Sequence, residues 1–191
     1  MKKEELRQIL EFMKETDKLK SVQRKTYLSQ EDRFEDAAQH SWHLALFTIL
    51  LKNQFSNELD YTKMLEMAIM HDLVEVYAGD TYAFDEVKNL DKQEREEVAA
   101  EKLFTQLPEE VRNKFIELNN EYMQKQSSEA QHVSALNKLI PKIQNKITNY
   151  KAWKDNNLSR EKLNESFTKY CEFNEKIKQL SEIIREDIKD Y

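Results

Sequence analysis

The sequence predicts an all-α domain, and two features of its composition support this prediction. In 191 residues there is one glycine and there are two prolines, so the chain has almost none of the residues that form tight β-hairpin turns. Charged residues make up 35% of the chain, and the apolar residues recur in short groups at helical spacing. A chain of this length buries enough surface to be one domain, so we expect residues 1–191 to form a single unit.

The N-terminal part predicts two helices joined by a long loop. Residues 3–20 are typical of a first helix, whereas residues 21–35 lack clear periodicity. A loop of that length in a compact helical domain is usually functional or mobile. Asp36 is a favourable N-cap, and a helix of about 20 residues should run from it to Phe55.

The middle of the chain predicts a third helix and then a pair of helices. The third helix should run from Asp60 to about Leu73 and be followed by a short turn that ends at Gly79. Gly79 suits the left-handed conformation that helix C-caps adopt. Residues 91–107 and 108–126 are typical of two helices with polar faces, divided where a proline takes a first-turn position.

The C-terminal third predicts two further helices. Residues Ser128 to Gln131 fit a capping box that opens a helix running to about Ile147. A last helix over residues 159–189 carries one apolar stripe, which either packs on its own domain or forms a dimer seam, so a homodimer is possible. The stripe consists of Leu163, Phe167, Tyr170, Ile177, Leu180, Ile184 and Ile188.

Charge and composition argue against several classes of protein. A net charge of -6 opposes the phosphate attraction on which nucleic-acid binding depends, although a small anionic ligand is compatible with a metal and an arginine. No window approaches the roughly 18 apolar residues of a membrane span. The single cysteine, Cys171, forms no internal disulfide, and the N-terminus lacks the apolar core of a signal peptide. We therefore expect a cytoplasmic protein that binds neither nucleic-acid polymers nor membranes.

Two histidines and an aspartate stand among apolar neighbours on predicted helices. His40 lies near the N-terminal end of a helix that is apolar nearly all round, so it should be buried or line a cleft. His71 and Asp72 also project among apolar residues, where an unpaired carboxylate would cost several kcal/mol. A divalent cation shared by His40, His71 and Asp72 would remove that cost, and this ligand set suits Zn, Fe, Ni, Co or Mn.

An asparagine faces inward on the helix that follows Ser128. Asn137 shares an arc with apolar residues of that helix, and Pro141 cannot donate a hydrogen bond to the carbonyl of Asn137. The backbone there should be kinked and have a free acceptor. A kink beside an inward amide is a suitable place for a site.

Four blocks of sequence resemble a known family when they are taken in order. They are Leu19–Thr26, Asp36–His43, His71–Thr81 and Glu129–Gln144. Together they resemble the HD-domain metal-dependent phosphohydrolases, most closely the branch of 5'-deoxynucleotidase-like and oxetanocin-resistance-like proteins. The resemblance implies a single-domain helical HD-domain bundle with a metal site between central helices. Its motif-bearing core would be about residues 19–145, with the C-terminal helix packed on it or at a dimer seam.

The resemblance also implies roles for individual residues. It implies His40, His71 and Asp72 as ligands of one divalent metal ion (Mn, Co, Ni, Fe, Zn or Mg). The fourth ligand of the family is an aspartate, and this chain has Asn137 in the corresponding motif, Ala135–Leu139. Asn137 is therefore a candidate ligand with a neutral oxygen, so we expect the site to carry one negative charge fewer.

The remaining candidates are a catalytic carboxylate and two residues near the substrate. The resemblance implies that Glu75 handles the proton of the attacking water and that Arg24 and Asp80 lie near the substrate. Each also has an ordinary interpretation: Glu75 as a surface glutamate, Arg24 as a solvated side chain, and Asp80 as part of a Gly-Asp turn.

Two functions follow from these residues. The first is a metal-dependent phosphomonoesterase that hydrolyses nucleoside 5'-monophosphates, with water activated by the metal as the nucleophile. The alternative is a non-catalytic nucleotide- or metal-binding regulatory module that has lost the fourth ligand.

Overall fold

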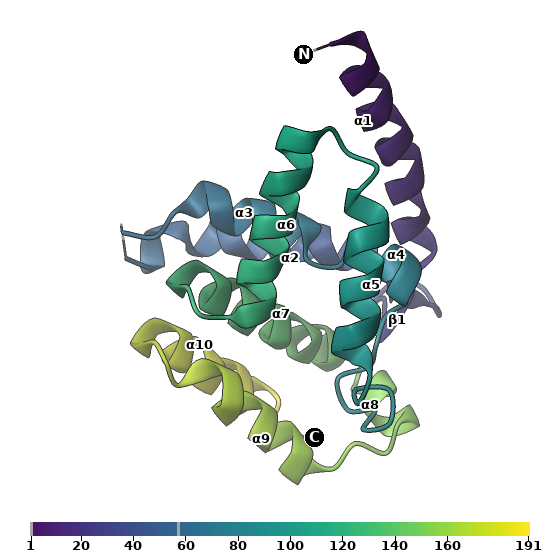
Figure 1. Ribbon diagram of the computed structural model, residues 1–191. Coiled ribbons are helices and arrows are strands. Elements are labelled where there is room, and N and C mark those ends of the chain that lie inside the picture. The colour runs from purple at the N-terminus through teal and green to yellow at the C-terminus, as the bar shows by residue number, and fades with distance from the viewer. Residues whose placement is uncertain (1, 57) are drawn as a thin grey trace.

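The computed structural model describes residues 2–56 and 58–191, which form a bundle of helices with one small β-ribbon (Figure 1). Its elements, in which η marks a 3-10 helix, are α1 (Lys3–Thr16), η1 (Asp17–Ser21), β1 (Gln23–Tyr27), β2 (Phe34–Asp36), α2 (Ala37–Leu51), η2 (Lys52–Gln54), α3 (Tyr61–Met70), α4 (Glu75–Ala78), α5 (Lys92–Phe104), α6 (Glu109–Gln124), α7 (Ser128–Ile147), α8 (Lys151–Asp155), α9 (Arg160–Cys171) and α10 (Glu175–Asp187). The prediction of an all-α fold is confirmed.

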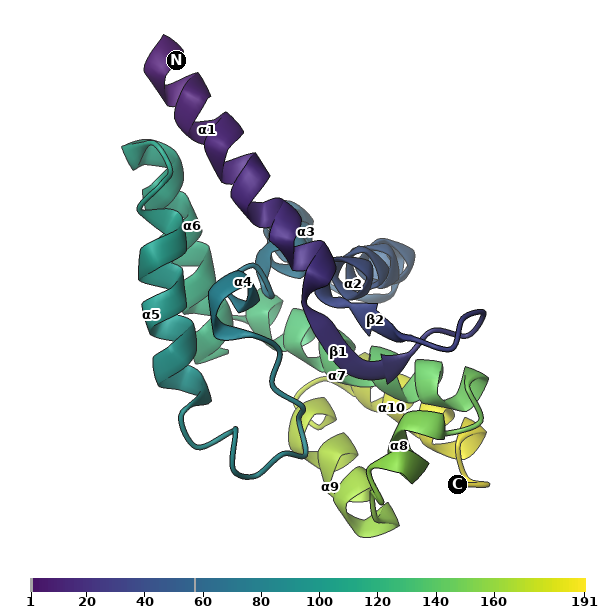
Figure 2. The same ribbon diagram turned by 90° about the vertical axis from the view of Figure 1, so that its right-hand side faces the viewer.

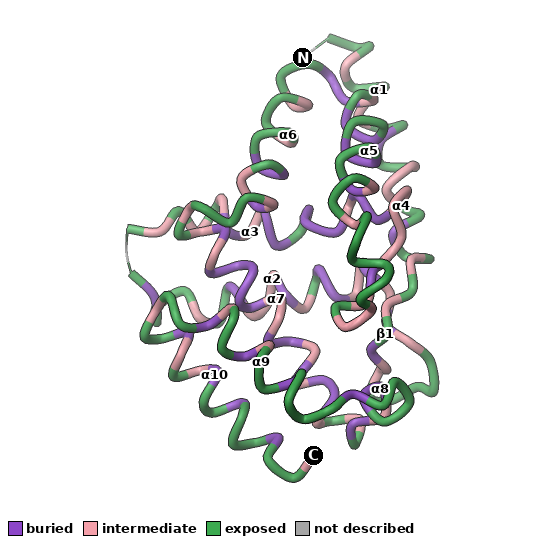
Figure 3. The backbone as a smooth tube through the Cα atoms, turned by 60° about the horizontal axis from the view of Figure 1, so that its bottom comes forward, coloured by how far each residue is buried: buried purple, intermediate pink, exposed green. Residues whose placement is uncertain are grey.

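Helix α7 lies at the centre of the bundle. It contacts α2, α3 and α6 on one side and α9 and α10 on the other. Buried positions concentrate along α7 and on the faces of α2 and α3 that meet it (Figure 3). Within the described residues, no helix is both long enough and apolar enough to cross a membrane.

Several predicted helix starts are confirmed by their caps. The Asp36 carboxylate accepts a hydrogen bond from the Gln39 N–H at 2.8 Å, and the Gln39 side chain accepts one from the Asp36 N–H at 3.0 Å. Asp60 caps α3 in the same way, accepting from the Lys63 N–H at 3.0 Å. The cap of α7 is Ser127, one residue before the predicted Ser128.

The segment predicted as a loop over residues 21–35 contains an antiparallel ribbon. Strands β1 and β2 pair so that Gln23 lies opposite Asp36 and Tyr27 lies opposite Phe34, with an irregularity in the register between these pairs. The rings of Tyr27 and Phe34 lie 4.4 Å apart and support the pairing. The strands are too short to show period-two alternation clearly, so the sequence pattern did not reveal them.

Helix α2 is buried on one face, not all round as its composition suggests. His40 and Leu44 are completely buried, but Trp42 is 67% exposed and Leu50 is 68% exposed. The surroundings of the helix, rather than its own apolar content, therefore decide which face is covered.

The helix predicted to run from Asp60 to Leu73 ends at Met70. His71 is its C-cap, and a turn leads into the short helix α4. Gly79 ends α4 with a φ of 71°, and its N–H donates to the Glu75 carbonyl at 2.8 Å. A Cβ at Gly79 would meet no atom of the described residues within 4 Å, so the backbone angle and not lack of space favours glycine here.

The C-terminal segment predicted as one helix over residues 159–189 is two helices. The first, α9, ends at Cys171, and Asn174 caps α10 by accepting hydrogen bonds from the Lys176 and Ile177 N–H groups. Both helices contact α7, and Phe167 and Ile177 of the apolar stripe are completely buried there. The helical period continues across the break, which is why the two segments look like one helix in the sequence.

Candidate metal centre and its pocket

The candidate ligands come from three helices that meet at the core. His40 lies in the first turn of α2, His71 and Asp72 follow the end of α3, and Asn137 lies in the middle of α7. One ligand atom from each of His40, His71 and Asp72 lies within 4.8 Å of the other two, and all three residues are buried. The Asn137 Oδ1 atom lies 2.8 Å from His40 Nε2, so all four side chains converge.

The contacts of His71 fit a bound cation. Its Nδ1 lies 3.1 Å from the Ala68 carbonyl oxygen, which can only accept, so Nδ1 carries a proton. Nε2 then has a lone pair, yet it is buried 3.0 Å from Asp72 Oδ1 and has no hydrogen-bond partner among residues 2–56 and 58–191. Two electron-rich atoms approach this closely only when a positive charge lies between them, either a second proton or a metal ion. The donor set of imidazoles and carboxylate suits a divalent transition metal.

The Asn137 amide is held in one orientation. Its Nδ2 donates to the hydroxyl oxygen of Tyr122 at 2.9 Å, which directs Oδ1 toward His40. Tyr122 is buried, and its ring also meets the His71 ring edge-on at a centroid distance of 5.4 Å. Tyr122 therefore contacts two of the four candidate ligands.

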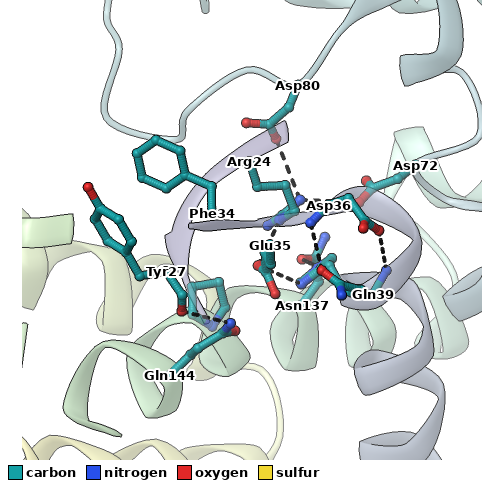
Figure 4. Close-up of polar contacts among 12 residues, drawn as sticks. Arg24, Tyr27, Phe34, Glu35, Asp36, Gln39, Asp72, Asp80, Asn137 and Gln144 are labelled. Atoms are coloured by element: carbon teal, nitrogen blue, oxygen red, sulfur yellow. Dashed lines mark hydrogen bonds and ion pairs between the residues drawn. The ribbon is translucent and has the colours of Figure 1, made fainter. Parts of the chain in front are cut away.

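Arg24 lies beside the cluster and contacts three carboxylates (Figure 4). Its Nε donates to Glu35 at 3.0 Å, and its terminal nitrogen donates to Asp72 at 3.2 Å and to Asp80 at 3.5 Å. The Glu35 carboxylate also lies 3.8 Å from His40 Nδ1. The unpredicted ribbon is what places Arg24 on β1 next to Glu35 on β2.

The carboxylates of the site have opposite protonation tendencies. Burial would raise the pKa of Asp72, but the charges of His71 and Arg24 hold it well below its usual range. Burial, together with the charges of Asp72 and Asp80, raises the pKa of Glu75 well above its ordinary value. Burial also raises the pKa of Asp80. Asp72 is therefore the permanent anion of the group, whereas Glu75 takes up a proton readily.

A pocket of about 330 Å³ opens from this cluster. Asp72, Glu75, Asp80, Arg24 and Asn137 line its inner end. All seven sequence-predicted residues lie at or next to this end, since His40 and His71 complete the cluster behind it.

Sequence reasoning missed two lysines of the pocket. Lys92, at the start of α5, forms an ion pair with Glu96 at 3.3 Å, and Lys138 follows Asn137 on α7. Burial and the nearby charge of Lys92 lower the pKa of Lys138 to about 7. The position of Lys138 beside Asn137 was a signal that could have found it, whereas no local pattern distinguishes Lys92 from a surface lysine.

Comparison with models of protein families assigns the chain to a family. A family model described as HD domain matches residues 16–180, and the chain belongs to this family. The human protein named 5'-deoxynucleotidase HDDC2 is 29% identical over 131 residues, which cover 68% of this chain and 63% of that protein. The bovine protein of the same name is also 29% identical, with 68% and 62% covered. The chain thus spans less than two thirds of the length of these curated relatives.

Solved structures extend the likeness over nearly the whole chain. A crystal structure described as a predicted metal-dependent phosphohydrolase from Magnetospirillum magnetotacticum is 31% identical with a TM-score of 0.88. The match covers 96% of this chain and 93% of that chain. A conserved hypothetical protein from Pyrococcus furiosus is 27% identical with a TM-score of 0.64, and the match covers 93% of this chain and 99% of that one.

Proposed function

We propose that this protein is a metal-dependent phosphomonoesterase that hydrolyses nucleoside 5'-monophosphates to a nucleoside and inorganic phosphate. The observation that carries the proposal is the convergence of His40, His71 and Asp72 beside a pocket that Asp72 and Glu75 line. The family of the chain and the relatives named as nucleotidases and phosphohydrolases support the same chemistry.

The four candidate ligands would hold one divalent ion. His40, His71 and Asp72 supply two imidazole nitrogens and a carboxylate oxygen, and Asn137 supplies a neutral amide oxygen. When bound, such an ion supplies positive charge to a phosphate oxygen and lowers the pKa of water. The ligand set carries a single negative charge, so it should hold the ion less tightly than a set with two carboxylates.

Glu75 is suited to move a proton. It is 4% exposed, and its Oε2 has no hydrogen-bond partner in the part of the chain that the structure describes. Its raised pKa brings its proton affinity closer to that of a general base at neutral pH. Glu75 also lines the pocket together with Asp72 and Asn137, which supports a role close to the metal site. We therefore assign Glu75 the role of accepting the proton of the attacking water.

The basic side chains of the pocket would bind the phosphate. Arg24 presents a planar guanidinium that can bind phosphate oxygens in pairs, and its hydrogen bonds to Glu35, Asp72 and Asp80 hold it beside the cluster. Lys92 adds positive charge from α5 on the wall of the same pocket, and Lys138 of α7, whose pKa is lowered to about 7, would be protonated more fully when a phosphate binds beside it. Asp80 would then orient Arg24 rather than touch the reacting atoms.

Asn137 favours a second candidate, a non-catalytic module that binds a nucleotide or a metal. Loss of one carboxylate weakens a metal site, and the scaffold would persist after loss of turnover. The two candidates differ in what the substitution Asn137→Asp does: a functional site is already active with asparagine, whereas a decayed site gains activity only with the aspartate.

The test is phosphate release from a panel of nucleoside 5'-monophosphates. Wild-type protein and the Asn137→Asp and Asp72→Asn variants are loaded in turn with Mn, Co, Ni, Zn and Mg, and metal content is measured by elemental analysis. We expect turnover by the wild type with at least one metal and none by Asp72→Asn. Metal-loaded wild type that releases no phosphate from any nucleotide would contradict the proposal, and turnover confined to Asn137→Asp would favour the decayed site.

A further inference from the structure

The segment between α4 and α5, residues 79–91, consists of turns and irregular backbone and lines part of the pocket. It runs from α4 past α9 and back to α5 (Figure 2), and an ion pair of 2.6 Å between Glu86 and Lys162 joins it to α9. Asp80, near its start, lines the pocket, and so does Lys92, which directly follows its end. The positions of these two charges therefore depend on how the ends of the segment are held.

One arginine near the start of α5 binds both ends of this segment. Arg95 donates from Nη1 to the Ala78 carbonyl at 2.8 Å and from Nη2 to the Thr81 hydroxyl oxygen at 3.0 Å. The same Nη2 donates to the Lys88 carbonyl at 2.9 Å, and Nε donates to the Asp91 carboxylate at 3.0 Å. The planar guanidinium thus joins the start of the segment to its end, which a single ammonium group could not do.

The contacts at the start of the segment fix the backbone around Asp80. Asp80 lies in the chain between Ala78 and Thr81, which are both bound by Arg95. The Asp80 carboxylate in turn accepts a hydrogen bond from Arg24 at 3.5 Å. A chain of contacts therefore runs from Arg95 through Asp80 to the arginine that lies beside the metal cluster.

The setting of these bonds distinguishes Arg95 from an ordinary arginine on a helix surface. Its ion pair with Asp91 contributes little by itself, because the Asp91 side chain is 60% exposed. The other three bonds go to two backbone carbonyls and to Thr81, which is 6% exposed. Polar groups of this kind lose stability when their partner is removed, so the guanidinium should hold the segment firmly.

We propose that Arg95 is a positioning residue, which holds residues 79–91 so that Asp80 directs Arg24 toward the phosphate and Lys92 stands at the wall of the pocket. The inference rests on the proposed function, because it assumes that the phosphate ester binds beside Arg24 and Lys92. Arg95 is not among the described residues that line the pocket, so it acts through these side chains and not on the substrate itself.

The first test is the activity of Arg95→Ala and its recovery with added guanidinium chloride. Misplacement of phosphate-binding groups should lower kcat/KM for nucleoside 5'-monophosphates roughly 10- to 100-fold, mainly through KM, while the metal content stays that of wild type. The Arg95 side chain is 31% exposed, so guanidinium, well below the concentration that unfolds the protein, should reach its place and restore part of the activity. Sodium chloride at the same concentration should not.

Two further variants complete this test. Arg95→Lys should stay impaired, because its ammonium cannot join both ends of the segment. Arg7→Ala is the control, because Arg7 forms an exposed ion pair with Glu4 on α1, and it should match wild type. Full activity of Arg95→Lys, or a loss in Arg95→Ala that guanidinium does not change, would overturn the inference.

Two measurements without turnover separate failure of this inference from failure of the proposed reaction. Hydrogen exchange of the backbone amides in residues 79–91 should accelerate in Arg95→Ala, whereas exchange in α7 should match wild type. Calorimetric titration of the metal-loaded protein with inorganic phosphate should show weaker binding in the variant. These two differences in a protein that hydrolyses no phosphate ester would contradict the proposed reaction and retain the role of Arg95. Exchange and phosphate affinity equal to wild type, or exchange accelerated equally in α7, would overturn that role while leaving the phosphatase intact.

Discussion

The inner end of the pocket lies in the interior of the bundle, whereas its outer wall lies at the periphery. His40, His71 and Asp72 are at most 6% exposed and are attached to helices that pack on one another and on α7. We call the lining residues of α9 and of the segment between α4 and α5 the outer wall, and its ion pair between Glu86 and Lys162 is exposed on both sides. The candidate metal ligands are therefore surrounded by packed helices, whereas the outer wall is partly held by contacts in solvent.

This difference predicts that substitutions have different effects in the two parts of the pocket. A substitution at the inner end leaves a buried charge or an unpaired donor and should be costly. A substitution at the outer wall should leave the fold in place, because its side chains are partly exposed. The experiments below measure that contrast, beginning with the largest expected effect.

Asp72→Asn should abolish the reaction. Asp72 is the only carboxylate in the cluster of three, so the variant loses the negative charge that holds a divalent ion. Loss of the charge and of activated water should lower kcat/KM roughly 10⁴-fold or more. Phosphate release and elemental analysis check this, and a variant that keeps both its metal and its activity would show that the cluster is not the reactive centre.

Glu75→Gln should lower kcat roughly 10²- to 10³-fold, because the amide cannot accept the proton of water. The metal content should stay near that of wild type, since Glu75 lies outside the cluster of candidate ligands. Glu94→Gln, an exposed position on α5, is the matched control. Equal kcat values for Glu75→Gln and the control would leave Glu75 without a role in proton transfer.

Tyr122→Phe should weaken metal binding about 10- to 100-fold, the usual cost of removing a group that orients a ligand. Without the hydroxyl, the Asn137 amide loses the contact at 2.9 Å that directs its oxygen toward His40. Calorimetric titration of the metal-free protein measures the affinity. The same change made in the Asn137→Asp background should have a smaller effect, because both carboxylate oxygens can coordinate; equal losses in the two backgrounds would argue against an orienting role.

The raised pKa of Glu75 should be visible in how the free energy of unfolding of the metal-free protein depends on pH. The folded-state pKa of Glu75 is raised above its unfolded value, so the folded state binds more protons and is favoured at low pH. That contribution is fully present below the unfolded pKa and is lost as pH rises through the folded pKa. Urea unfolding from pH 4 upward should show this loss in wild type and not in Glu75→Gln; identical profiles would contradict the raised pKa.

Lys162→Ala should change stability by less than about 1 kcal/mol, because its ion pair with Glu86 is solvent-exposed. The side chains of Lys162 and Glu86 are 52% and 80% exposed, which leaves the interaction screened by water and salt. Thermal unfolding at low and high salt is the measurement. A loss well above 2 kcal/mol would mean that the periphery of the pocket is held as firmly as its interior.

The sequence predicted the helices better than their ends and breaks. Periodicity and capping residues located α2, α3 and α7, but the end of α3 at Met70 and the break between α9 and α10 were missed. A helical pattern continues through a short turn without interruption, so the period alone cannot show where the chain changes direction.

Some residues of the candidate site were predicted from the sequence and others were missed, for a similar reason. His40, His71, Asp72 and Asn137 are recognisable because polar residues in apolar surroundings require a partner. Tyr122, Lys92 and the residues of α9 carry no such local signal, since their importance comes from what they face in space. Glu35 was also missed, because the ribbon that carries it was predicted as a loop.

The class of fold and the inward positions of His40, His71 and Asp72 could be inferred from the sequence, because they follow from helical spacing and the cost of burying charge. Asn137 stands out only against the aspartate that the family has in the corresponding motif. The packing of the helices was needed to show that His40 and Asn137, 97 residues apart, have side-chain atoms 2.8 Å from one another. Such proximity depends on how whole helices pack around α7, and packing between distant segments leaves no periodic trace in the chain.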